Sequence, residues 1–205
     1  KAALTVTAEE KTKVYGAANP TLSVVYDGFV NGDTVDSLDT SVAISTSASA
    51  ASTVGTYPIV ASTAADANYA ITFVNGTLTI TRAALTVNVA DASRIYHQPN
   101  PTFTGTILGL LNDDPITATY STAATIESPV DSYGIAATLV DPSGRLENYT
   151  VAIGAGTLRI GKAQPVLAFT ASVNTTPLSG SAPVTVTLTE QMGGRPIAGQ
   201  TVTIM

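Results

Sequence analysis

Hydrophobic and polar residues alternate over several stretches of the chain, and a period of two predicts β-strands. Leu4, Val6 and Ala8 alternate with threonines, and Leu78 and Ile80 do the same further along. Strands of this kind bury one face and expose the other, so threonine is expected on the exposed face. The chain is therefore predicted to be mostly β. Because no apolar run reaches the roughly 18 residues of a membrane helix, we expect no membrane insertion by this segment.

The alternating pattern occurs twice. Residues 3–16, ALTVTAEEKTKVYG, correspond to residues 84–97, ALTVNVADASRIYH, at an offset of 81 positions, as from Leu4 to Leu85. Further corresponding pairs are Asn19-Pro20 with Asn100-Pro101, Gly28 with Gly109, Asp33 with Asp114, Tyr57 with Tyr133, and Asn68-Tyr69 with Asn148-Tyr149. The offset changes only in the middle, which indicates loops of different length on a shared framework.

The repeat predicts three parts: module 1 (residues 1–82), module 2 (residues 83–161) and a third segment (residues 162–205). The third segment starts with Lys-Ala like module 1, but then loses the landmarks of the repeat and is an incomplete module of another type. The seam TLTITRAALTV holds no flexible linker. A short, extended join restricts the angle between modules and predicts an elongated arrangement.

Two segments depart from the strand pattern, and they predict one short helical turn in each module. In module 1, Asp33 is a suitable N-cap, and Val35 and Leu38 lie three apart on one helical face. In module 2, Pro115 follows Asp114 at what would be the first helical position.

Asn75-Gly76 lies between two strand-like runs and predicts a tight hairpin. Both central positions of a type I′ turn need positive φ, which these residue types tolerate. Periodicity does not distinguish a β-grasp-like sheet from a sandwich, so both topologies stay open for the modules.

Composition excludes several classes of function. Acidic residues outnumber basic ones by 15 to 9 and the net charge is -6, so we expect no nucleic-acid partner. The chain has no cysteine, which removes disulfides, thiolate metal ligands and cysteine nucleophiles. It also has no tryptophan. With alanine making up much of the apolar fraction, the cores should be thin.

The sequence contains no constellation that points to catalysis. His97 is the single histidine, so no histidine pair can bind a metal, and no nucleophile elbow or phosphate-binding loop is present. We therefore expect no catalytic residues, no cofactor and no metal site, and no enzyme activity. Asp33, Asp36 and Asp39 form a spaced acidic run. It is interpreted as a cap with a solvated face, and Ca²⁺ binding there stays open because the spacing of an EF-hand loop is absent.

Glycine and tyrosine landmarks of module 1 are predicted to have structural roles. Gly16 and Gly28 are expected at positions where a Cβ would strain the backbone. The large side chains expected to fill the core of module 1, with hydroxyls at its edge, are Tyr15, Tyr26, Tyr57 and Tyr69.

Module 1 resembles the MBG repeat of the YGX type. The resemblance rests on, in order, Leu4-Thr5-Val6, Val14-Tyr15-Gly16, Asn19-Pro20, Tyr26-Asp27-Gly28-Phe29-Val30-Asn31-Gly32-Asp33, Gly55-Thr56-Tyr57, Asn68-Tyr69 and Gly76-Thr77-Leu78-Thr79-Ile80. Module 2 is a diverged copy, with Tyr96-His97 in place of the Tyr-Gly pair. The third segment is similar to the opening strands of a bacterial Ig-like β-sandwich.

The resemblance implies mostly β modules in tandem arrays of large bacterial surface and secreted proteins. We therefore expect a non-catalytic stalk or spacer of a bacterial cell-surface or secreted, adhesin-like protein, placed outside the cell, whose partners are neighbouring repeats of the same chain. One alternative is recognition of a glycan or host protein, with Tyr120 and Tyr133 as candidate contacts. Another is an accessory region of an extracellular hydrolase. The incomplete third segment should leave an edge that pairs with another chain through residues 163–205.

Overall fold

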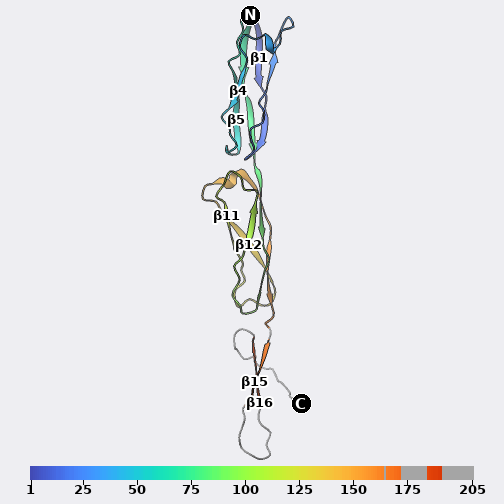
Figure 1. The fold of residues 1–205 in the computed structure, drawn as a ribbon, viewed down its shortest axis with the longest axis vertical. Coiled ribbons are helices and arrows are strands. Elements are labelled where there is room, and N and C mark those ends of the chain that lie inside the picture. The colour runs from blue at the N-terminus through green and yellow to red at the C-terminus, as the bar shows by residue number, and fades with distance from the viewer. Residues whose placement is uncertain (164, 172–183, 191–205) are drawn as a thin grey trace, which may run out of the picture. The chain divides into compact units, whose positions relative to one another are not determined.

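The computed structural model describes residues 1–163, 165–171 and 184–190. The fold is mostly β, with about half of the residues in strands, and it contains two tandem β modules as predicted (Figure 1). In these described ranges, no helix is long and apolar enough to cross a membrane.

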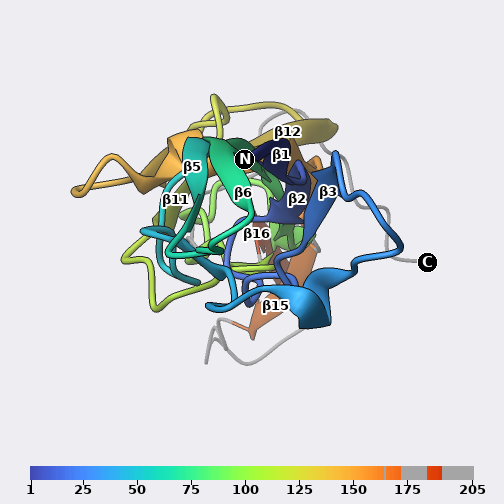
Figure 2. The same cartoon turned by 90° about the horizontal axis from the view of Figure 1, so that it is seen from above.

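Module 1 consists of two mixed sheets. Its elements are β1 (Ala2–Ala8), β2 (Lys11–Val14), β3 (Val24–Asp27), η1 (Val35–Ser37), β4 (Ala43–Thr46), β5 (Gly55–Ser62), β6 (Tyr69–Val74) and β7 (Gly76–Thr81). One sheet has the order β3-β1-β6 and the other β2-β7-β5-β4. β1 also lies against β5 and β7 of the other sheet. Figure 2 views these strands end-on. The module is thus a small sandwich rather than a single grasp-like sheet.

The same two segments of the chain pair in parallel in both sheets. β1 pairs with β6 in parallel from Ala2 opposite Tyr69, and β2 pairs with β7 in parallel from Lys11 opposite Leu78, so both pairings have the same offset of 67. The chain therefore passes from one sheet to the other at residues 9–10 and again, beside it, at residue 75.

The predicted hairpin at Asn75-Gly76 is wrong. The strands on either side of it, β6 and β7, belong to different sheets, and neither residue has a positive φ. Gly76 is needed for another reason. A Cβ at Gly76 would lie 2.5 Å from the carbonyl oxygen of Ala8, because the parallel neighbour crosses at the same level.

Every second side chain along the strands is apolar and fills the space between the sheets. Leu4 and Val6 of β1 and Leu78 and Ile80 of β7 are fully buried, while the threonines between them are partly exposed. Ile59 of β5 completes the contact from the second sheet. Burial of these branched side chains is the main favourable term for such a module.

Module 2 repeats the arrangement. Its elements are β8 (Ala83–Val89), β9 (Ala92–Ile95), β10 (Gly105–Leu108), β11 (Thr117–Ser121), β12 (Ser132–Val140), η2 (Arg145–Asn148), β13 (Tyr149–Ile153) and β14 (Gly156–Gly161). The sheet orders are β10-β8-β13 and β11-β12-β14-β9. β8 with β13 and β9 with β14 again pair in parallel, both at an offset of 66.

The helical turns are 3-10 turns, and their positions differ from the prediction. In module 1 the turn covers η1 and its N-cap is Thr34, not Asp33. In module 2 the turn is η2, and residues 112–116 form no helix. Asn112 and Asp113 both have φ near +55, in the left-handed region. A left-handed pair, Asn31 and Gly32, also precedes η1 in module 1, so these φ values alone do not prevent a turn. After Asp114 the Ile116 N–H donates to the Asp114 carbonyl at 2.8 Å and β11 begins at Thr117, so no 3-10 turn forms.

In the third segment, β15 (Pro165–Ala171) and β16 (Val184–Glu190) form an antiparallel pair. The predicted Ig-like sandwich and edge pairing through residues 163–205 depend largely on positions outside the described ranges.

Compact units of the structure do not follow the repeat boundary. One unit comprises Lys1–Asn88, Thr106–Thr119 and Thr138–Gly154, and the other comprises Val89–Gly105, Tyr120–Ala137 and the described residues from Ala155 onward. The first unit therefore includes all of module 1 and one half of module 2. Its single core cluster contains residues of both modules, whereas the second unit has its own cluster around Ile135, Leu158 and Ile160.

Candidate functional site: the junction between the modules

The most elaborate polar arrangement in the described part of the chain lies where module 1 meets the part of module 2 that belongs to the same compact unit. β7 ends at Thr81 and β8 begins at Ala83, so Arg82 alone separates the two modules. The Arg82 Nε donates a hydrogen bond to the carbonyl oxygen of Glu147 at 3.0 Å. The short seam predicted from the sequence is present, and it brings the ends of the two modules into contact.

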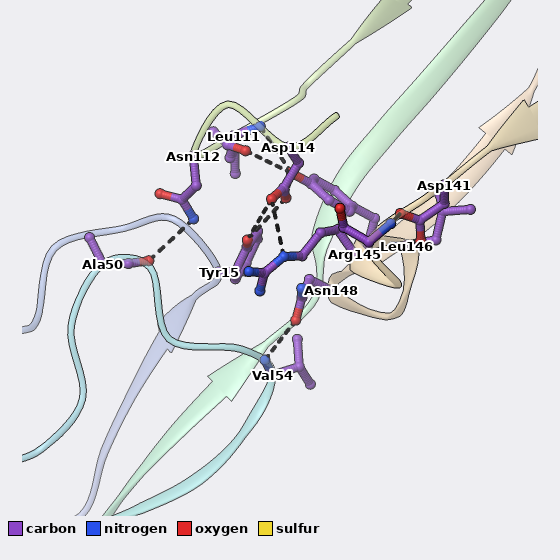
Figure 3. Close-up of polar contacts among 12 residues, drawn as sticks. Tyr15, Ala50, Val54, Leu111, Asn112, Asp114, Asp141, Arg145, Leu146 and Asn148 are labelled. Carbon is purple, nitrogen blue, oxygen red and sulfur yellow. Dashed lines mark hydrogen bonds and ion pairs between the residues drawn. The ribbon is translucent and has the colours of Figure 1, made fainter. Parts of the chain in front are cut away.

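At the centre of the junction is the carboxylate of Asp114, which is only 8% exposed. Its Oδ2 accepts hydrogen bonds from the hydroxyl of Tyr15 at 3.0 Å and from the hydroxyl of Tyr149 at 2.6 Å (Figure 3). The Nε of Arg145 lies 3.8 Å from Oδ1. A buried carboxylate is costly unless hydrogen bonds and charge compensate it. Here one module supplies Tyr15, and the other supplies Tyr149 and Arg145.

Tyr149 also fixes the loop that carries the carboxylate. Its hydroxyl accepts a hydrogen bond from the backbone N–H of Leu111 at 2.9 Å and donates its proton to Asp114. The Asp114 N–H in turn donates to the Leu111 carbonyl at 3.0 Å. Burial, followed by the hydrogen bond to Asp114, raises the pKa of Tyr149 to about 12. The phenol is therefore a neutral donor under ordinary conditions.

Gly16 provides room for the side chain of Leu111. Its φ is +80, and a Cβ built there would lie 2.8 Å from the Cδ1 of Leu111. Any other residue at this position would collide with module 2 as well as adopt a disfavoured backbone conformation. The prediction that Gly16 occupies a strained position is confirmed, and the structure adds that its neighbour belongs to the next module.

Two further hydrogen bonds cross the junction. The backbone N–H of Val54 donates to Oδ1 of Asn148 at 2.9 Å, and the Nδ2 of Asn112 donates to the carbonyl oxygen of Ala50 at 3.4 Å (Figure 3). Asn148 is only 2% exposed. Its side-chain oxygen therefore satisfies a main-chain donor of module 1.

Beneath the polar groups the two modules share apolar contacts. The rings of Tyr15 and Tyr149 meet edge to face, with centroids 5.5 Å apart. The buried members of the shared core cluster on the module 2 side are Ala83, Leu85, Ile116 and Tyr149. The junction thus combines a continuous core with a satisfied polar network, which favours a single arrangement of the contact over a hinge.

The loops behind Tyr15 are held from inside module 1. The Lys13 side chain is buried, and its Nζ donates to the carbonyl oxygens of Ala17 and Ser49 at 3.0 and 2.6 Å. Burial lowers the pKa of Lys13. The Nδ2 of Asn19 donates to the carbonyl oxygen of Ala48 at 2.6 Å. We call the surface formed by Tyr15, Gly16, Ala50 and Val54 the trailing end of module 1.

In module 2, the corresponding loops are held in the same way. Arg94 takes the place of the buried lysine and donates to the Thr125 carbonyl and to the side chain of Asn100. The Nδ2 of Asn100 donates to the carbonyl oxygen of Ala124 at 2.7 Å. These bonds reproduce the framework of a trailing end at the far end of the second repeat.

The surface on that framework differs. The trailing end of module 2 is formed by Tyr96, His97, Ile126 and Val130, at positions that correspond to those of module 1. His97 stands where the glycine was, with φ +64. Its ring meets that of Tyr96 at 4.2 Å, and its Nε2 lies 3.6 Å from an Oε2 of Glu127. The two apolar side chains are nearly half exposed.

The acidic residues considered for Ca²⁺ binding lie away from the junction. The carboxylate of Asp33 accepts the hydroxyl of Tyr69 at 2.7 Å, and that of Asp39 accepts the N–H of Ala67 at 2.9 Å. Asp36 lies in η1. Among the described residues no group of three or more acidic or histidine side chains is arranged to hold a metal ion.

The candidate glycan contacts are also part of a core. Tyr120 and Tyr133 are partly buried and pack against the core cluster of the second unit. The hydroxyl of Tyr133 donates to the carbonyl oxygen of Pro129 at 3.0 Å.

Sequence reasoning did not find the Asp114 network. It placed Asp114 at the start of a short helical turn and treated Tyr15 as a core residue of one module. A usable signal was present, because Asp114 and Tyr149 both recur as Asp33 and Tyr69 in module 1. A repeated acid and a repeated tyrosine far apart in each copy indicate a contact that the modules have in common.

Two mixed sheets in each module, with corresponding parallel pairings in both copies, define a tandem β-repeat protein. The chain belongs to the family described as MBG domain (YGX type), whose model matches residues 4–79 and 85–159. The tandem MBG repeat inferred from the sequence landmarks is thereby confirmed. A search of curated proteins finds no match.

Proposed function

We propose that this chain is a structural repeat segment, a stalk or spacer, of a bacterial cell-surface or secreted protein of the adhesin type. It performs no catalysis and its third segment begins an Ig-like module. The chemistry it needs is only that of holding neighbouring domains in a set relation, and the side chains of the junction serve that purpose.

The observation that carries this proposal is the junction itself. A single residue, Arg82, joins the modules, and Asp114 is buried between tyrosines that come from both of them. A flexible linker would leave these groups in water. In an array whose modules meet through shared cores, the position of each module follows from that of the one before, and the length of the array scales with the number of modules.

Small-angle scattering of the whole chain tests the spacer role. We expect a radius of gyration well above about 17 Å, the value for a compact globule of this length. The control is a variant with a flexible glycine-serine insertion after Arg82, which should broaden the pair-distance distribution. A compact radius for the unmodified chain would refute the spacer.

Antibody labelling tests the location. Antibodies raised against the chain should label intact cells of the source organism, or its culture medium, without permeabilisation. Labelling that requires permeabilised cells would refute the proposed placement and leave the junction geometry unaffected.

A further inference from the structure

Module 1 carries at its other end the same polar group that module 2 uses at the junction. We call the surface formed by Val30, Asp33, Asn68 and Tyr69 the leading end of module 1. The hydroxyl of Tyr69 donates to Oδ2 of Asp33 at 2.7 Å and accepts the N–H of Val30 at 3.1 Å. The Asp33 N–H donates to the Val30 carbonyl at 3.0 Å.

Each of these bonds has a counterpart in module 2. The leading end of module 2 is formed by Leu111, Asp114, Asn148 and Tyr149, at the positions that correspond to those of module 1. Tyr149 donates to the acid at 2.6 Å and accepts the Leu111 N–H at 2.9 Å. The two leading ends are therefore the same construction, formed by residues about 80 positions apart.

The two constructions differ in what covers them. In module 2, where the trailing end of module 1 is seated, the asparagine is 2% exposed and the aspartate 8%. In module 1 the corresponding Asn68 is exposed, Asp33 is partly exposed and Val30 is 45% exposed. Yet Tyr69, which positions the acid, is only 3% exposed, so the carboxylate is held in place by a rigid, buried support.

The surface around Asp33 is hollowed. A depression of about 550 Å³ is lined by, among others, Val30, Asn31, Asp33 and Tyr69. In module 2, the equivalent carboxylate receives its second hydroxyl from Tyr15. The hollow in module 1 thus offers an oriented acceptor and an apolar side chain at the positions where module 2 engages a tyrosine and a glycine.

We propose that the leading end of module 1 is a docking surface for the trailing end of another module of this family, one that presents a tyrosine followed by glycine. The tyrosine hydroxyl donates to Asp33, the glycine makes room for Val30, and a free backbone N–H donates to the side-chain oxygen of Asn68. The inference rests on the junction geometry alone and does not depend on the spacer role.

The chain itself supplies a suitable partner. Module 1 has a trailing end with Tyr15 and Gly16, and the seam that follows it reads Arg-Ala-Ala-Leu-Thr-Val, while module 1 itself begins Lys-Ala-Ala-Leu-Thr-Val. A duplicated chain, with residues 1–82 placed directly before residues 2–205, therefore preserves the local sequence of the existing seam and presents this trailing end to the leading end of the second copy.

Paired spin labels measure whether the new junction forms. Because the protein has no cysteine, a cysteine introduced at a chosen position is the sole site of attachment for a spin label. One pair joins Thr12 of the added copy to Val25 of the original module 1, and a reference pair joins Thr12 of the original module 1 to Thr106 of module 2. All three positions are exposed. We expect a distance distribution across the new junction as narrow as that of the reference pair.

Two variants then act on opposite sides of the proposed contact. Asp33→Ala in the original module 1 and Gly16→His in the added copy should each broaden the new distribution at least twofold and leave the reference pair narrow. Asp36→Ala, an exposed acid of the same segment, is the matched control and should change neither. A broad distribution in the unmodified duplicated chain, or a narrow one that survives both variants, would overturn the proposal.

Discussion

The trailing ends of the two modules share one framework and differ in the surface built on it. In module 1 a buried Lys13 holds the loop, and Tyr15 and Gly16 face the next module. In module 2, Arg94 holds the corresponding loop, and His97 occupies the position of the glycine. The internal hydrogen bonds occur in both modules, so they stabilise the loops of the fold itself. The glycine occurs only in module 1, where it makes room for the contact with module 2.

This difference separates two requirements that a repeat must meet. A module has to pair its own strands, which both copies do with corresponding parallel pairings. It also has to present an end that its neighbour can contact, and that end differs in module 2, where His97 and Ile126 stand in place of Gly16 and Ala50.

The largest expected effect comes from transferring the module 2 residue to module 1. Gly16→His would place a side chain 2.8 Å from Leu111 in a left-handed backbone conformation. We expect the free energy of unfolding to fall by about 2–5 kcal/mol, from overpacking and backbone strain together. Urea unfolding followed by tyrosine fluorescence measures this. The reverse change, His97→Gly, should alter stability by less than about 1 kcal/mol.

Gly32 provides the control for backbone strain. It has a similar φ of +83 but nothing within 4 Å of an added Cβ. Gly32→Ala should therefore cost only the strain, about 1 kcal/mol, and Gly16→Ala should cost clearly more. Equal losses at the two sites would show that Leu111 does not matter.

Second in size is the loss of the buried carboxylate. Asp114→Ala removes the buried carboxylate that accepts from both Tyr15 and Tyr149 and leaves the Tyr15 hydroxyl without its acceptor, so we expect a loss of about 2–4 kcal/mol. Asp33→Ala, at the corresponding position of module 1, should cost less than about 1 kcal/mol because Asp33 is partly exposed and the Tyr69 hydroxyl keeps the Val30 carbonyl as an acceptor at 3.3 Å. Chemical denaturation of both variants makes the comparison, and losses of equal size would contradict it.

A smaller difference is expected between the paired asparagines. Asn148→Ala removes the acceptor of the Val54 N–H inside the junction and should cost about 1–2 kcal/mol. Asn68→Ala changes an exposed side chain and should stay within about 0.5 kcal/mol. Hydrogen exchange gives an independent readout, since the Val54 amide should lose protection only in the first variant.

A further effect concerns stability at alkaline pH. The pKa of Tyr149 is raised from 10.0 to about 12, so the unfolded phenol ionises before the folded one. Its contribution to stability is complete below pH 10 and is lost as the pH rises to about 12. Tyr149→Phe should flatten this part of the alkaline unfolding profile, whereas Tyr57→Phe, outside the junction, should not. An unchanged slope in the first variant would contradict the assignment.

The local features of the fold were predictable from the sequence. Period two identified strands such as β1 and β7, because burial of one strand face imposes that pattern directly. Gly28 was also correctly interpreted as a position that excludes a Cβ, which would lie 2.3 Å from the carbonyl oxygen of Ala3. Such requirements are visible in a few neighbouring residues.

Features that depend on distant parts of the chain were not predictable in this way. Asn75-Gly76 suggested a hairpin because the turn signal is local, yet the strands around it pair with partners about 67 positions away. The Asp114 network joins residues 99 and 35 positions apart. The helical turn expected at Pro115 is absent because the Ile116 N–H donates to the Asp114 carbonyl and the chain then enters β11 at Thr117, a strand whose partner, β12, lies outside the local sequence.

The parallel register described for module 1 has a mechanical consequence. The chain enters the module at β1 and leaves it at the far end of β7, and the ladder formed by β1 with β6 and β2 with β7 lies between these points. A force applied through the two termini of the module therefore loads those hydrogen bonds in shear, all at once, instead of peeling them apart one by one. Each repeat is arranged as a clamp that resists stretching along the direction in which an array would be pulled.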